Sequence, residues 1–173
     1  MKTLVFLVEE PSAEEMLSRL VPKILKTMPG KAETDHNILV FQGKSDLEDK
    51  LVRRLRRWRK PDSFFMIIRD QDSGDCHMIK KNLMNLCRKA GKSDCLVRIA
   101  CHELESFYLG DLAAVEAGLS IQGLKEKQMQ KKYRSPDSIA RPSDELVRIT
   151  GRKYQKMAGS RAITPHMDLS DNR

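Results

Sequence analysis

Acidic residues follow three separate apolar segments of the chain, directly after the point where each segment ends. The pairs are Glu9 and Glu10, Asp70 and Asp72, and Glu103 and Glu105. Carboxylates that converge without compensating cations repel one another and raise each other's pKa values, so a convergent cluster favours a bound hard cation. Mg²⁺ or Mn²⁺ prefers such oxygen ligands, and two such ions suit phosphodiester chemistry. The sequence therefore predicts a magnesium or manganese site.

The spacing Asp70-x-Asp72 is the most specific part of this pattern. Successive side chains of an extended backbone point to opposite faces, so these two aspartates are predicted to lie on the same side and to share one ion. A structural interpretation is also open, because Asp70, Asp72, Ser73 and Asp75 are residue types that favour turns and helix N-caps.

Basic residues supply a candidate surface for a polyanion. The formal net charge is +8, and six of the eight positions from 53 to 60 are Arg or Lys. This run is either a solvated helix face or a surface that contacts phosphate groups. The residues predicted to bind nucleic acid are Lys44, Arg53, Arg54, Arg56 and Arg57.

The elements that must position these side chains alternate along the chain. Buried strands are expected at 2–8, 37–41, 64–68 and 95–100, and helices at 11–25, 45–58, 79–87 and 103–115. Ser45 and Glu48 have the spacing of a capping box for the second helix. Such alternation is typical of an α/β fold with a Rossmann-like, mostly parallel sheet of about four strands flanked by helices. Functional groups in such a sheet gather at the carboxyl ends of the strands.

The 173 residues fit one domain. We expect residues 1–117 to form the α/β core, and residues 118–173 to form a helical or irregular extension that packs on the same domain. A last helix is expected at 143–158.

Several protein classes are disfavoured by composition. No apolar run approaches the roughly 18 residues needed to cross a bilayer, so no membrane association is expected. The apolar N-terminus lacks the features of a signal peptide, which predicts a cytoplasmic location. The four cysteines form no CxxC pair, which argues against a zinc ribbon or a dithiol redox site.

Four separated motifs carry a family resemblance. They lie at 8–14 (VEEPSAE), 41–47 (FQGKSDL), 70–73 (DQDS) and 102–111 (HELESFYLGD). In this order they resemble the bacterial family labelled domain of unknown function 4276. That family in turn resembles the Toprim superfamily of topoisomerases, primases and nucleases of the overcoming-lysogenization-defect type. The Toprim pattern is a glutamate after the first strand and DxD after the third, which fall here on Glu9 and on Asp70 and Asp72.

The resemblance implies roles for particular residues. Glu9 would be a general acid/base or metal ligand, while Asp70 and Asp72 would hold Mg²⁺. Candidates for a second ion are Glu14, Glu103 and Glu105. Toprim proteins usually have glycine where this chain has Glu10, which leaves the choice between Glu9 and Glu10 open.

The C-terminal segment also resembles the family and offers cations. Lys156 or Arg161 would neutralise phosphate charge in the transition state, unless they are ordinary surface residues. The hypothesis that follows is a Mg²⁺-dependent, Toprim-like nuclease in a bacterial or phage defence system, with an ATPase as partner protein and with homo-oligomer formation. The alternatives are a non-catalytic metal-binding subunit of an ATPase complex and a nucleic-acid-binding module without chemistry.

Overall fold

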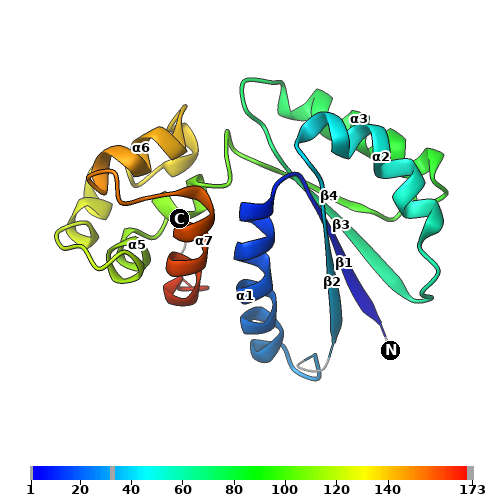
Figure 1. The fold of residues 1–173 in the computed structure, drawn as a ribbon, viewed down its shortest axis with the longest axis horizontal. Coiled ribbons are helices and arrows are strands. Elements are labelled where there is room, and N and C mark those ends of the chain that lie inside the picture. The colour runs from blue at the N-terminus through cyan, green and yellow to red at the C-terminus, as the bar shows by residue number, and fades with distance from the viewer. Residues whose placement is uncertain (1, 32–33, 171–173) are drawn as a thin grey trace.

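A computed structural model describes residues 2–31 and 34–170, and its centre is a four-stranded sheet (Figure 1). The strands are β1 (Thr3–Val8), β2 (Asp35–Val40), β3 (Ser63–Asp70) and β4 (Leu96–Ala100). All pairings are parallel and the order is β2-β1-β3-β4. The predicted α/β fold with a parallel sheet of about four strands is therefore confirmed.

Helices cover both faces of the sheet. The α1 helix (Pro11–Thr27) lies on one face, while α2 (Lys44–Arg57) and α3 (Cys76–Lys89) lie on the other (Figure 1). The alternation of side chains in β1 serves both layers. Phe6 and Val8 are buried in the cluster that contains α1, whereas Val5 and Leu7 are buried with α2 and α3. Adjacent residues beyond the strand end are therefore directed to opposite faces.

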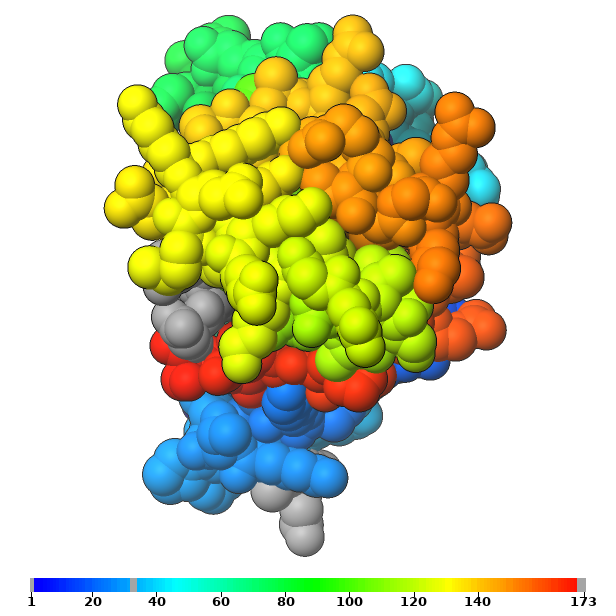
Figure 2. Space-filling model, turned by 90° about the vertical axis from the view of Figure 1, so that its left-hand side faces the viewer, coloured from blue at the N-terminus to red at the C-terminus, as the bar shows by residue number. Residues whose placement is uncertain are grey.

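The chain after β4 forms short helical segments that pack over α1. They are α4 (Ser106–Leu109), α5 (Leu112–Gly118), η1 (Lys125–Met129), η2 (Pro136–Ser138), α6 (Pro142–Ile149), α7 (Lys156–Ile163) and η3 (Thr164–His166). Leu112, Leu146 and Ile163 share one buried cluster with Leu17 and Val21 of α1. In Figure 2 the red C-terminal segment lies between the blue α1 region and the yellow and orange part of this layer. The α1 helix is thus covered by sheet on one side and by this layer on the other.

The single helix expected at 103–115 is two helices in the structure. The α4 helix ends at Leu109, and Asp111 caps α5 by accepting a hydrogen bond from the backbone N–H of Ala114 at 2.9 Å. A cap of this kind satisfies a backbone donor at a helix start. The apolar periodicity continues across the break, which is why it suggested one helix. The expected helix at 143–158 is likewise divided between α6 and α7.

The capping box expected at Ser45 and Glu48 is absent. The N-cap of α2 is Gly43, with φ of +92° and ψ of 175°, and no side chain caps this helix end. That backbone conformation is open to glycine and closed to most other residues. Glu48 instead pairs with Arg69 of β3 at 3.0 Å.

None of the described helices is both long and apolar enough to span a membrane.

Candidate functional site

The strand order places a topological switch point at the carboxyl ends of β1 and β3, and we call this place the crevice. The chain leaves β1 toward β2 on one side, and β3 lies on the other side, so this is the point where ligands bind in open α/β sheets. Val8 pairs with Ile68. Two residues beyond this pair, Glu10 lies level with Asp70, and both side chains belong to the face covered by α1.

Three carboxylates meet in this crevice. Glu10, Asp70 and Glu105 each offer one oxygen, and these oxygens lie within 4.8 Å of one another. Glu105 precedes α4, just beyond the end of β4, and is fully buried, while Asp70 is 9 % exposed. We call this group the acidic triad. Three carboxylate oxygens are a donor set suited to Mg²⁺ or Mn²⁺.

Lys156 lies at the first position of α7 and supplies a positive charge to the triad. Its Nζ is 3.2 Å from Glu10 Oε2 and 3.9 Å from Glu105 Oε1. Burial lowers the pKa of this ammonium group, but the charges of Glu105 and Glu10 outweigh that effect and raise the pKa overall. Lys156 is therefore a protonated counter-ion of the carboxylates.

Tyr154 holds one oxygen of Glu105 and leaves the other without a partner. The Tyr154 hydroxyl donates to Glu105 Oε1 at 2.9 Å. Glu105 Oε2 is buried and has no hydrogen-bond partner among the described residues. Buried polar atoms are nearly always paired, so a water molecule or a ligand is expected as the partner of this oxygen. A hard cation bound by the triad would fit that requirement.

The electrostatics of the triad disfavour three negative charges at once. Burial, together with the charges of Glu10, Glu105 and Glu9, raises the pKa of Asp70 to about 8. Burial also raises the pKa of Glu105, although Lys156 and the Tyr154 hydrogen bond oppose this shift. A bound metal ion would supply the positive charge that three ionised carboxylates need here.

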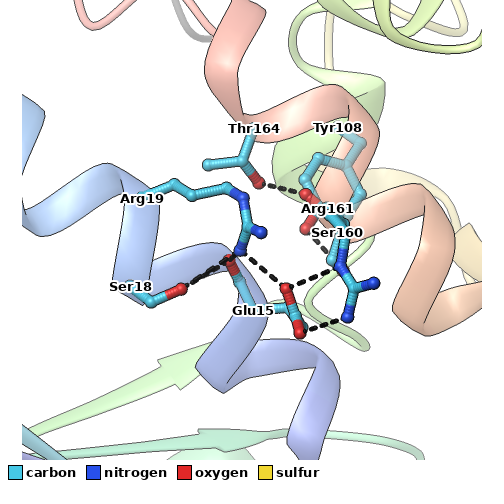
Figure 3. Close-up of polar contacts among 7 residues, drawn as sticks. All are labelled: Glu15, Ser18, Arg19, Tyr108, Ser160, Arg161 and Thr164. Atoms are coloured by element: carbon cyan, nitrogen blue, oxygen red, sulfur yellow. Dashed lines mark hydrogen bonds and ion pairs between the residues drawn. The ribbon is translucent and has the colours of Figure 1, made fainter.

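The position of Lys156 depends on how α7 is attached to the rest of the molecule (Figure 3). Arg161 pairs with Glu15 of α1 through distances of 2.7 and 3.3 Å, and Glu15 also pairs with Arg19 at 2.6 Å. On its buried side, Ser160 accepts a hydrogen bond of 2.8 Å from the Tyr108 hydroxyl of α4. The sequence offers Arg161 as an alternative to Lys156 for neutralising phosphate charge. In the structure its guanidinium group instead pairs with Glu15 and joins α7 to α1.

Comparison with models of known protein families assigns the chain to a family. The family model described as Domain of unknown function (DUF4276) matches residues 8–173. The chain belongs to this family. Comparison with curated proteins and with solved structures finds no match. The matched range of this DUF4276 protein contains the whole triad and Lys156, while the further resemblance to Toprim proteins stays a prediction.

Glu9 of this DUF4276 protein lies on the opposite face from the triad. Its Oε2 is 3.6 Å from Nε of the buried Arg69, whose other partner is Glu48 of α2. Burial and the nearby charge of Asp72 raise the pKa of Glu9, while Arg69 lowers it. Of the two glutamates after β1, the structure thus brings Glu10 and not Glu9 to Asp70 and Glu105.

Asp72 is likewise separated from the triad. The strand ends at Asp70, and Asp72 has φ of +54°, in the left-handed region, so the alternation expected for extended backbone does not reach it. Its Oδ2 accepts a hydrogen bond of 2.9 Å from Lys44 Nζ. Asp75 has the structural role of a helix N-cap. Its side chain accepts hydrogen bonds from the backbone N–H groups of His77 and Met78 at the start of α3.

The remaining acidic candidates are not part of the triad. Glu14 is exposed on α1. Glu103 Oε2 accepts a hydrogen bond of 2.7 Å from the backbone N–H of Ser143, at the start of α6. Glu103 therefore ties the layer after β4 to the carboxyl edge of the sheet.

Sequence reasoning missed Tyr154 and did not commit to Glu10 as a ligand. A usable signal existed for Glu10, because it stands two residues after the last strand residue of β1 as Asp70 stands two residues after Ile68. No local signal exists for Tyr154, which is 49 residues from its partner Glu105.

Proposed function

We propose that this DUF4276 protein hydrolyses phosphodiester bonds of nucleic acid with the help of Mg²⁺ or Mn²⁺. The observation that carries the proposal is the acidic triad at the carboxyl ends of β1, β3 and β4, with one buried carboxylate oxygen left unpartnered. Glu10, Asp70 and Glu105 would hold the ion. When bound, the metal would activate a water molecule for attack on phosphorus and would neutralise charge on the phosphate.

The protein's own residues have separate tasks in this scheme. The Tyr154 hydroxyl fixes the rotamer of Glu105, so that the free Oε2 keeps its place in the crevice. Lys156 balances the carboxylates while the crevice holds no other cation, and its flexible side chain can turn to a phosphate oxygen when one arrives. Glu9 with Arg69 and Asp72 with Lys44 form charged pairs on the other side of the strand ends. These pairs would border the path of the substrate.

Membership of a Toprim-like nuclease group, a role in defence, an ATPase partner and a cytoplasmic location belong to the same proposal. They rest on the resemblance of the motifs. Homo-oligomer formation is part of the proposal as well.

A second candidate is a non-catalytic subunit that binds metal or nucleic acid within an ATPase complex. The observation that favours it is Lys156, because an internal ammonium group already compensates part of the triad's charge. Metal binding without cleavage of DNA or RNA would support this alternative.

The test is a calorimetric titration with Mn²⁺ and Mg²⁺, because it needs neither substrate nor partner. Asp70→Asn and Glu10→Gln remove triad ligands, while Asp72→Asn and Glu9→Gln are matched controls one or two positions away. We expect the first two variants to lose at least about tenfold in metal affinity, because removal of a mere outer-shell partner of a metal ligand already costs about tenfold or more. The controls should stay within about threefold of wild type.

Two results would overturn the assignment of the ion to the triad. One is a wild-type protein that binds neither metal, and the other is equal loss of affinity in Asp70→Asn and Asp72→Asn. A cleavage assay on labelled DNA and RNA, with Asp70→Asn as the inactive reference, then tests the hydrolysis itself.

A further inference from the structure

A hollow of about 350 Å³ lies beside the edge strand, outside the acidic triad. Its lining residues are Leu39 of β2, then Arg53, Arg54 and Arg57 of α2, and Trp58. Because β2 has a neighbour on one side only, this hollow opens at the free edge of the sheet. We call it the arginine pocket.

None of the three guanidinium groups of the arginine pocket forms an ion pair among the described residues, although Arg54 interacts electrostatically with Asp46 of the same helix. Arg53, Arg54 and Arg57 are exposed, and none of them has a salt bridge or side-chain hydrogen bond within the part of the chain that the structure describes. Arg56, on the same helix, instead donates to the backbone carbonyl of Lys89 at 2.7 Å and so joins α2 to α3. Arg56 thus has a structural partner, whereas the three arginines of the pocket are available to an anion.

Trp58 gives the arginine pocket a rigid wall. Its Nε1 donates to Ser63 Oγ at 2.8 Å, and its ring meets Phe65 edge to face with a centroid distance of 6.0 Å. Guanidinium groups gathered in this way bind phosphate strongly, because their planar donors match two phosphate oxygens at once.

The distance between the arginine pocket and the crevice sets a length for the ligand. The α2 helix begins beside the crevice, since the backbone N–H of Gly43 donates to the carbonyl of Glu9 at 2.9 Å. Arg53 and Arg57 are nine and 13 residues beyond Lys44, which corresponds to about 14 to 20 Å along a helix. Phosphates on one strand of a duplex rise by about 3.4 Å each. About four to six nucleotides would span the stretch from Lys44 to the arginine pocket, and a ligand that also reaches the acidic triad must be at least this long.

We propose that the arginine pocket is a second phosphate-binding site, which holds the backbone of a polynucleotide whose scissile bond lies in the crevice. This rests on the proposed function and deepens it, because it assigns the substrate to polynucleotides long enough to reach both sites, in preference to mononucleotides and dinucleotides. Binding of a polynucleotide by the arginine pocket does not require hydrolysis, so it is tested without metal.

The experiment measures fluorescence anisotropy of labelled single-stranded and duplex DNA of about 16 nucleotides in EDTA, over a range of salt concentrations, with a labelled dinucleotide for comparison. The test variant is Arg53→Gln/Arg54→Gln/Arg57→Gln. The control is Lys125→Gln/Lys131→Gln/Arg134→Gln, three exposed cations of the layer seen in Figure 2. Both variants lower the net charge from +8 by three, to +5.

We expect the arginine variant to bind the long DNA at least about tenfold more weakly, with a salt slope smaller by about two to three, roughly one for each lost phosphate contact. Wild type should bind the dinucleotide far more weakly than the long DNA, and the arginine variant should not change that weak binding. The control should keep wild-type affinity for the long DNA.

Three results would overturn the proposal: wild-type affinity in the arginine variant, an equal loss in the control, or equally effective displacement of the DNA by poly-glutamate. The last would assign the pocket to acidic polypeptides. If DNA binding depends on the three arginines but no metal-dependent cleavage is found, the phosphate-binding role of the arginine pocket is supported and only the proposed hydrolysis is wrong.

Discussion

Lys156 and a metal ion have the same carboxylates as partners, so they should compete. The Lys156→Met variant removes an ammonium group 3.2 Å from Glu10 and 3.9 Å from Glu105. Unit charges about 4 Å apart interact by about 4 kcal/mol at an effective dielectric constant of 20, and tenfold in affinity corresponds to about 1.4 kcal/mol. We expect Lys156→Met to bind Mn²⁺ at least about tenfold more tightly in calorimetry, while any cleavage activity falls.

Lys44→Met is the matched control for this prediction. Lys44 pairs with Asp72, outside the triad, so its loss should leave Mn²⁺ affinity close to that of wild type. Weaker metal binding in Lys156→Met would contradict the competition and would make the lysine a support of the site.

Asp70 should make the stability of the metal-free protein depend on pH. Its pKa is raised from 3.8 to about 8 in the folded state, chiefly by burial, so folding favours the protonated acid. The stabilisation relative to a charged carboxylate is complete below the unfolded pKa and is lost as pH rises toward 8. The free energy of unfolding of Asp70→Asn should therefore rise relative to that of wild type as pH rises through this range, by at most about 1.4 kcal/mol per pH unit.

Urea unfolding in EDTA measures this difference, with the exposed Asp49→Asn of α2 as the control for the substitution itself. A constant difference between Asp70→Asn and wild type from pH 4 to 8 would contradict the raised pKa. Mn²⁺ should restore the stability of wild type at the alkaline end and should not stabilise Asp70→Asn.

At the scale of elements, the approach of α7 to Tyr154 requires a glycine. A Cβ atom added at Gly159 would lie 2.3 Å from Cε2 of Tyr154, well inside contact distance. Although alanine is the better helix former by about 1 kcal/mol, the clash should dominate. We expect Gly159→Ala to lower the free energy of unfolding by about 1 to 3 kcal/mol, as overpacking does.

A double-mutant cycle assigns this cost to its cause. In a Tyr154→Leu background the obstructing ring is absent, so Gly159→Ala should cost much less. Equal costs in both backgrounds, measured by urea unfolding, would show that another contact of α7 is responsible.

At the scale of the whole molecule, the sheet and the layer after β4 should unfold together. The buried cluster around α1 contains Phe6 and Val8 of β1 as well as Leu146 and Ile163. Neither side can bury its apolar surface alone, so a single cooperative transition is expected.

The chain has convenient probes for this prediction. Its one tryptophan, Trp58, follows α2, and its three tyrosines all lie after β4. Trp58 fluorescence and second-derivative tyrosine absorbance should give the same urea midpoint. Separate midpoints would divide the molecule into two independently folding units, against the expectation of one domain.

The sequence by itself determined the elements and their faces. Apolar runs of strand length separated by amphipathic segments are local signals, and they predicted all four strands and the helices between them, with ends within three residues of those observed. Local signals also predicted that acidic residues stand at strand ends. These local signals predicted one helix where the Asp111 side chain caps a new helix, α5. They also predicted Ser45 as the N-cap of α2, where the structure has Gly43.

Tertiary structure decided which acidic residues meet. Strand pairing sets Glu10 level with Asp70 and sends Glu9 toward Arg69, because adjacent residues at a strand end point to opposite faces. The sequence shows this alternation but not which face will receive a third carboxylate. Lys156 and Tyr154 reach the triad only because α7 packs back on α1, through contacts between residues about 50 to 150 positions apart. Such contacts depend on how buried surfaces fit together, and no local pattern of residues encodes that fit.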